Sequence, residues 1–192
     1  MLGKKRRKDL EYYVRTASGQ YEYVGPRYRY AGETPRKKNL ALLWALTAGA
    51  FAGTIVCGFL PAPGMAVSWY VVVPYVLSLV LSVAVLMALG KMTGEGDAIR
   101  AYVYETAWTR LPVRCVLSGI FAAAAAVGHI VWSIRWGVGK QAAAAFAFIV
   151  LMTGVCALQF LARKVTDRMP WEGPDDDGKK DAVPDSAGDR DP

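Results

Sequence analysis

His129 is the side chain of this sequence best suited to proton chemistry near neutral pH. It is the only histidine of the 192 residues, and it lies inside a long apolar stretch. Imidazole titrates near neutrality, and an ionisable group at membrane depth is by default a functional-site hypothesis. Helical rise places it level with Tyr75 and with the Tyr70 carbonyl that Pro74 leaves without a donor. The pattern allows a functional polar cluster of His129 and Tyr75, but we rank an ordinary interhelical hydrogen bond above it.

Other reactive residue types do not form catalytic or metal-ligating patterns. The cysteines Cys57, Cys115 and Cys156 lie in or beside apolar stretches without a CxxC spacing, which indicates buried thiols rather than a disulfide or metal site. No Asp, Glu, Lys or Arg lies in the middle of an apolar stretch. We therefore predict no catalytic residue, no metal site, no cofactor and no enzyme activity. A membrane enzyme would need a pocket built from the remaining carboxylates, Glu95, Asp97, Glu105 and Asp167.

Four nearly uncharged stretches dominate the chain. The first has 22 residues, which is roughly 33 Å of helix and enough to cross a hydrocarbon core of about 30 Å. Residues 91–114 form the longest connection, an expected cytoplasmic loop whose segment 98–111 reads as an interfacial helix or as a strand. The predicted transmembrane helices are residues 39–60, 69–90, 115–134 and 141–162.

Small and polar residues recur at four-residue spacing within these predicted helices. Gly49 and Gly53 match the GxxxG motif that lets two membrane helices approach closely. We expect this face to pack within the chain or between copies. The same spacing predicts further packing positions at Ser78, Ser82, Ser118 and Ala122.

Basic residues predict the orientation. Eleven Lys or Arg precede the first span, four lie in the central connection and six follow the last span, whereas Arg135 and Lys140 lie on the other side. The positive-inside rule then predicts an integral cell-membrane protein with cytoplasmic N- and C-termini.

Residues 1–38 form a basic, tyrosine-rich cytoplasmic segment with an expected β-hairpin at residues 12–24. Interleaved tyrosines and cations suit anionic lipid headgroups or a protein partner. They could also stack on RNA, but no RNA-binding motif accompanies them, so nucleic acid ranks below these partners. The predicted contact residues are Tyr21, Tyr23, Arg27, Tyr28, Arg29, Arg36, Lys37 and Lys38.

These expectations define an all-α membrane protein, a four-transmembrane-helix bundle with a short N-terminal cytoplasmic β-hairpin and a disordered acidic C-terminal tail at residues 163–192. The function expected of it is a non-enzymatic accessory or scaffolding component in the lipid bilayer, contacting a protein partner or a second copy. The alternative is a small oligomeric transporter or channel with His129 in its polar cluster.

Overall fold

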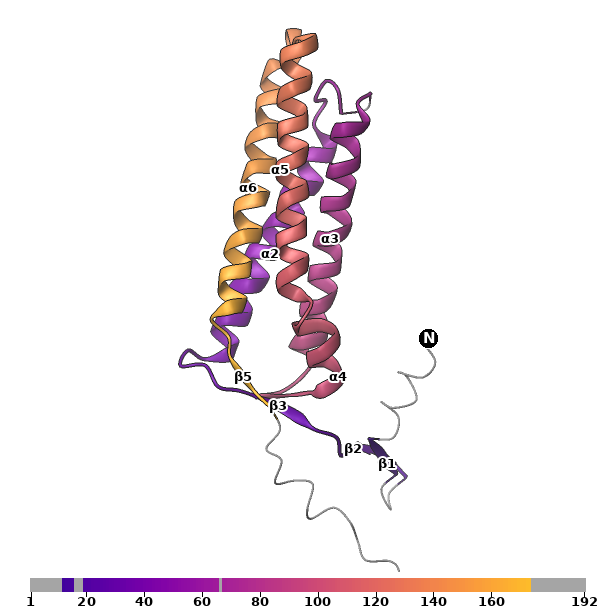
Figure 1. Cartoon of the computed structure of the whole chain (residues 1–192), viewed down its shortest axis with the longest axis vertical. Coiled ribbons are helices and arrows are strands. Elements are labelled where there is room, and N and C mark those ends of the chain that lie inside the picture. The colour runs from indigo at the N-terminus through magenta and orange to yellow at the C-terminus, as the bar shows by residue number, and fades with distance from the viewer. Residues whose placement is uncertain (1–11, 16–18, 66, 174–192) are drawn as a thin grey trace, which may run out of the picture.

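The computed structural model describes residues 12–15, 19–65 and 67–173. Within them the chain is mostly helical, with short strands gathered at one end of a helix bundle (Figure 1). Four helices are long and apolar enough to cross a membrane, as predicted. They are α2 (Arg36–Phe59), α3 (Trp69–Thr93), α5 (Leu111–Trp136) and α6 (Ala142–Asp167).

Each helix contains most or all of its predicted span and extends beyond it at the strand-bearing end. α2 begins at Arg36 rather than at residue 39, and α6 continues to Asp167 rather than ending at residue 162. Helical hydrogen bonding does not require an apolar side chain, so it continues into charged turns that hydropathy assigns to the flanks. The charged flanks are therefore held in fixed positions by the helices.

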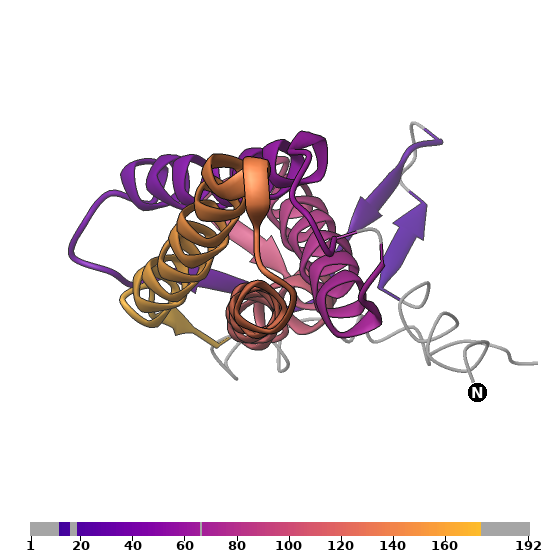
Figure 2. The same cartoon turned by 90° about the horizontal axis from the view of Figure 1, so that it is seen from above.

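The four helices pack on one another to different extents. α5 lies between α3 and α6, while α2 crosses behind the bundle at an angle and packs mainly on α6 (Figures 1 and 2). Gly53 and Gly49 lie on this contact, because a Cβ atom on them would lie 3.1 Å from Val155 and 3.6 Å from Leu158. The GxxxG face of this chain is thus used between α2 and α6.

Buried serines join α3 to α5. The Ser78 hydroxyl donates to the Ser118 carbonyl at 3.1 Å, and the Ser118 hydroxyl donates to the Ser78 carbonyl at 3.2 Å. Ser82 lies 3.0 Å from the Ser118 hydroxyl and accepts a bond from the Gln159 amide of α6 at 3.2 Å. Ala122 is buried one turn further along α5. Polar pairing in an apolar interior fixes these three helices in register.

The strands form two small antiparallel sheets. One is the predicted hairpin, in which β1 (Tyr13–Arg15) pairs with β2 (Tyr21–Tyr23) and Gly19 has a positive φ of 82°. The other was not predicted. Its central strand, β3 (Arg27–Tyr30), lies between β4 (Ala98–Arg100) and β5 (Trp171–Glu172).

This second sheet corrects two sequence-based expectations. Residues 98–111 are neither one helix nor one strand, because β4 is followed by a short turn of helix, α4 (Ala101–Val103), and a π-helical turn, η1 (Tyr104–Trp108). The predicted tail does not begin at residue 163, because α6 and β5 occupy its first part. Residues 174–192 of that tail lie outside the described residues.

Candidate contact surface at the strand-bearing end

Alternate residues of β3 lie on opposite sides of the sheet. Tyr28 and Tyr30 are half-buried and pack on the cluster that forms the core at this end of the bundle, whereas Arg27 and Arg29 are exposed. Successive side chains of a strand point to opposite faces, so one strand carries both the anchor and the surface. β3 therefore holds two arginines on the side away from the core.

Aromatic contacts hold this sheet against the helices. The ring of Tyr28 stacks on Tyr104 of η1, with centroids 3.9 Å apart and an angle of 8° between planes. Tyr30 meets Trp171 edge-on at 5.5 Å, and Trp171 meets Trp108 at 5.6 Å. Such pairs contribute about 0.5–1.5 kcal/mol each beyond the area they bury. Tyr28, predicted as a contact residue, is thus half-buried and anchors β3 to η1.

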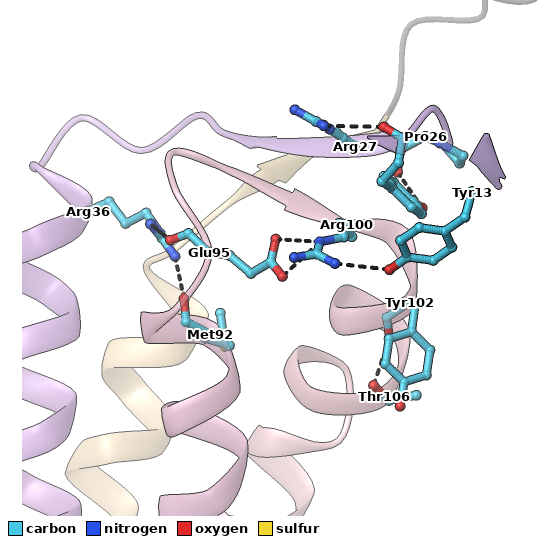
Figure 3. A network of polar contacts seen from close by, with 10 residues as sticks. Tyr13, Pro26, Arg27, Arg36, Met92, Glu95, Arg100, Tyr102 and Thr106 are labelled. Carbon is cyan, nitrogen blue, oxygen red and sulfur yellow. Dashed lines mark hydrogen bonds and ion pairs between the residues drawn. The ribbon is translucent and has the colours of Figure 1, made fainter. Parts of the chain in front are cut away.

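Arg36 is a structural residue rather than a headgroup contact, which corrects its predicted role. Its guanidinium is buried and donates to the Met92 carbonyl at 2.7 Å, to the Glu95 carbonyl at 2.9 Å and to the Gly96 carbonyl (Figure 3). A helix leaves its last carbonyls without partners and its C-terminus favours positive charge. The first residue of α2 therefore caps the end of α3.

Arg100 connects the hairpin to the bundle. Its side chain forms an ion pair with Glu95 at 3.0 Å and donates to the Tyr13 hydroxyl at 2.9 Å (Figure 3). The bond to Tyr13 raises the pKa of the Arg100 guanidinium above its ordinary value. The guanidinium also lies over the ring of Tyr23, 5.9 Å from its centroid. The hairpin is thereby attached through tyrosines that face the bundle.

The two hairpin tyrosines predicted as contacts have different roles. Tyr23 is buried against the rings of Tyr12 and Tyr13, and its hydroxyl donates to the Pro26 carbonyl at 3.3 Å. Burial raises the pKa of this phenol above its ordinary value of 10.0. Tyr23 is therefore an anchor and not a surface residue. Tyr21 is exposed and remains available for contact.

Exposed cations lie at or near the ends of the helices on the strand-bearing side. Lys37 and Lys38 point outward from the first turn of α2, as the sequence suggested. Further exposed cations from other helix ends join them, and these had predicted only the orientation. This group, which we call the collar, consists of Lys37, Lys38, Lys91, Arg110, Lys164 and Arg168.

The polar cluster predicted at the other end of the bundle is not formed as expected. The Tyr75 hydroxyl donates to the Thr54 carbonyl at 3.1 Å, and the Tyr70 carbonyl faces Gly128. His129 is fully buried beside Phe148, with ring centroids 4.8 Å apart, and its two nitrogens have no hydrogen-bond partner among the described residues. Its surroundings are those of a packed aromatic side chain.

Two of the four carboxylates considered for an enzyme pocket form separate ion pairs. Glu95 is paired with Arg100, and Asp167 with Arg163 of the preceding turn at 3.0 Å. In residues 12–15, 19–65 and 67–173, no three His, Cys, Asp or Glu side chains are close enough to hold a metal ion.

Gln159 is the polar residue that sequence analysis overlooked. It is fully buried on α6, and its amide donates to the Ser82 hydroxyl of α3 at 3.2 Å. An amide this deep in an apolar stretch is a detectable signal, because buried polar groups require partners.

Comparison with protein-family models, with curated proteins and with solved structures finds no match to this chain.

Proposed function

We propose that this chain is a four-span integral membrane protein that acts as a non-enzymatic accessory or scaffolding component. In this arrangement the strand-bearing end and both chain termini face the cytoplasm. The charge distribution supports it, because the collar lies at that end, while Arg135 and Lys140 are the cations of the opposite end.

The strand-bearing end has two candidate contact surfaces at different distances from the membrane. The collar lies at or near helix ends, where phospholipid headgroups would lie in a membrane. Each Lys or Arg there gains roughly 1 kcal/mol from an anionic membrane surface. Arg27 and Arg29 instead lie on a sheet that runs across the base of the bundle (Figure 1).

The exposed pair Arg27 and Arg29 is the single observation that carries the proposed role. Their strand is fixed by aromatic packing on one face, so the two guanidinium groups are presented on a rigid element. Guanidinium binds carboxylates and phosphates in a two-point geometry. We infer that an acidic surface of a protein partner binds this face while the collar contacts anionic lipid.

The packing around His129 favours this role over an oligomeric transporter. A transport lumen requires a wet polar path, whereas His129 is enclosed beside Phe148 and Trp132, next to buried Ala125 and Ala126 of its own helix.

Capture of the full-length protein from native membranes in a gentle detergent tests the proposal. We expect a protein partner to be recovered with the wild type and lost with the variant Arg27→Gln/Arg29→Gln. The matched control, Arg135→Gln/Lys140→Gln, removes two charges from the opposite end and should retain the partner. Recovery of no partner with any form, or of the same partner with the Arg27→Gln/Arg29→Gln variant, would overturn the assignment.

A further inference from the structure

The chain leaves the described structure beside the exposed arginines. Trp171 lies opposite Tyr30 and Glu172 lies opposite Arg29 in the antiparallel pairing of β5 with β3. The next residue, Gly173, lies beside Tyr28, because a Cβ atom on it would be 3.8 Å from that ring. At Gly173 the chain thus runs toward the Arg27 end of β3.

The positive charge on this part of the sheet is uncompensated at Arg27, whereas Arg29 lies opposite the carboxylate-bearing Glu172. Arg27 lies directly opposite Arg100 on β4, and like charges at facing positions of two strands destabilise their pairing. Arg100 has Glu95 as an ion-pair partner, whereas neither ion pair found in the described part of the chain includes Arg27 or Arg29. Within the described residues, the Arg27 side chain donates to a neutral group, the Tyr23 carbonyl at 3.3 Å. Additional negative charge at this position would therefore stabilise the sheet.

The residues that follow Gly173 carry that charge. Residues 174–192 contain seven aspartates against three Lys or Arg, beginning with Asp175, Asp176 and Asp177. An extended residue spans about 3.3–3.6 Å, so the carboxylates begin within roughly 7 Å of Gly173. Chain length from Gly173 therefore allows the first aspartates of this segment to reach the two exposed guanidinium groups.

We propose that residues 174–192 are an intramolecular ligand of the Arg27 and Arg29 face, bound through the aspartates at 175–177. A tether of this length gives an effective concentration on the order of millimolar. A soluble acidic partner must compete with that concentration to bind the same face. The tail then sets a threshold for partner binding at the surface described above.

The contact is reversible by its physical nature. Exposed ion pairs contribute little free energy each and weaken with salt. A partner with a larger acidic surface can therefore displace the tail. This inference concerns the surface of the proposed function, but its test needs no partner, so the two can fail separately.

Zero-length cross-linking in the full-length protein tests the contact. The substitutions Arg27→Lys and Arg29→Lys keep both charges and supply amines that a carbodiimide can join to a nearby carboxylate. Tryptic peptides are then analysed by mass spectrometry at about 0.05 M and about 0.5 M salt. The native amines Lys37, Lys38 and Lys164 of the same end, and Lys140 of the opposite end, are internal controls.

We expect amide links from positions 27 and 29 to the aspartates at 175–177, at several times the yield of links to Lys37, Lys38 or Lys164. Their yield should fall several-fold at the higher salt concentration. Mixing ¹⁴N- and ¹⁵N-labelled protein should give links within one copy only. The inference is wrong if positions 27 and 29 give no link, if the aspartates prefer the collar lysines, or if mixed-isotope links predominate.

Discussion

Removal of the Arg36 side chain should destabilise the bundle far more than removal of its neighbour. Arg36 donates to three carbonyls at the end of α3 and beyond it, and the substitution Arg36→Met leaves all three without that donor. Hydrogen bonds to a charged group contribute about 1.5–3 kcal/mol each, and burial of the guanidinium offsets several kcal/mol of the sum. We expect a net loss of about 3 kcal/mol.

Thermal unfolding in detergent with a thiol-reactive fluorophore measures this loss. Cys57 and Cys115 are buried and become reactive as the bundle opens. For a chain of this size, 1 kcal/mol corresponds to roughly 2–4 °C, so Arg36→Met should lower Tm by about 6–12 °C. The control Lys37→Met removes the same charge from an exposed neighbour and should change Tm by about 2 °C at most.

A third variant separates charge from geometry. Arg36→Lys keeps the positive charge but has a single ammonium group in place of the planar guanidinium. It should fall between the wild type and Arg36→Met. The capping role of Arg36 would be refuted if Arg36→Met lowered Tm no further than Lys37→Met.

Three further predictions follow from buried contacts. Gly128→Ala should cost about 1–3 kcal/mol, because its Cβ would lie 2.8 Å from the Tyr70 carbonyl, whereas Gly154→Ala, in open space, should be neutral in the same assay. His129→Phe should leave the free energy of unfolding unchanged or raise it by about 1 kcal/mol, because an apolar ring replaces a buried imidazole without a hydrogen-bond partner among the described residues. A large loss of stability would instead show that His129 has a hydrogen-bond partner. The raised pKa of Tyr23 means that the folded state favours the neutral phenol. Its contribution to the free energy of unfolding is therefore present below about pH 10 and is lost as the pH rises above it. The stability of Tyr23→Phe should depend less on pH between about 9 and 11 than that of the wild type.

The four long helices were predictable because their signal is local. Each apolar stretch carries its own evidence for length and hydropathy, and each structural helix contains most or all of the predicted span. The hairpin was predictable for a similar reason, since its two strands are neighbours and Gly19 marks the turn.

The second sheet could not be predicted in the same way. β4 and β5 have three and two residues, too few for a period, and they pair with β3 from distant parts of the chain. Arg36 was interpreted with Lys37 and Lys38 as one cationic run, yet the helical rotation of about 100° per residue turns Arg36 inward and its neighbours outward. Which member of a charge run is buried depends on what packs beside it.

Cysteine accessibility tests most directly the claim that the strand-bearing end faces the cytoplasm. Tyr21 lies at that end and Trp136 at the other, and each side chain is 70% exposed, so Tyr21→Cys and Trp136→Cys are matched probes. With a membrane-impermeant maleimide, the Trp136→Cys protein should be labelled in intact cells, and the Tyr21→Cys protein only after lysis. Labelling of Tyr21→Cys in intact cells, with protection of Trp136→Cys, would contradict the orientation and the cytoplasmic contact surface that depends on it.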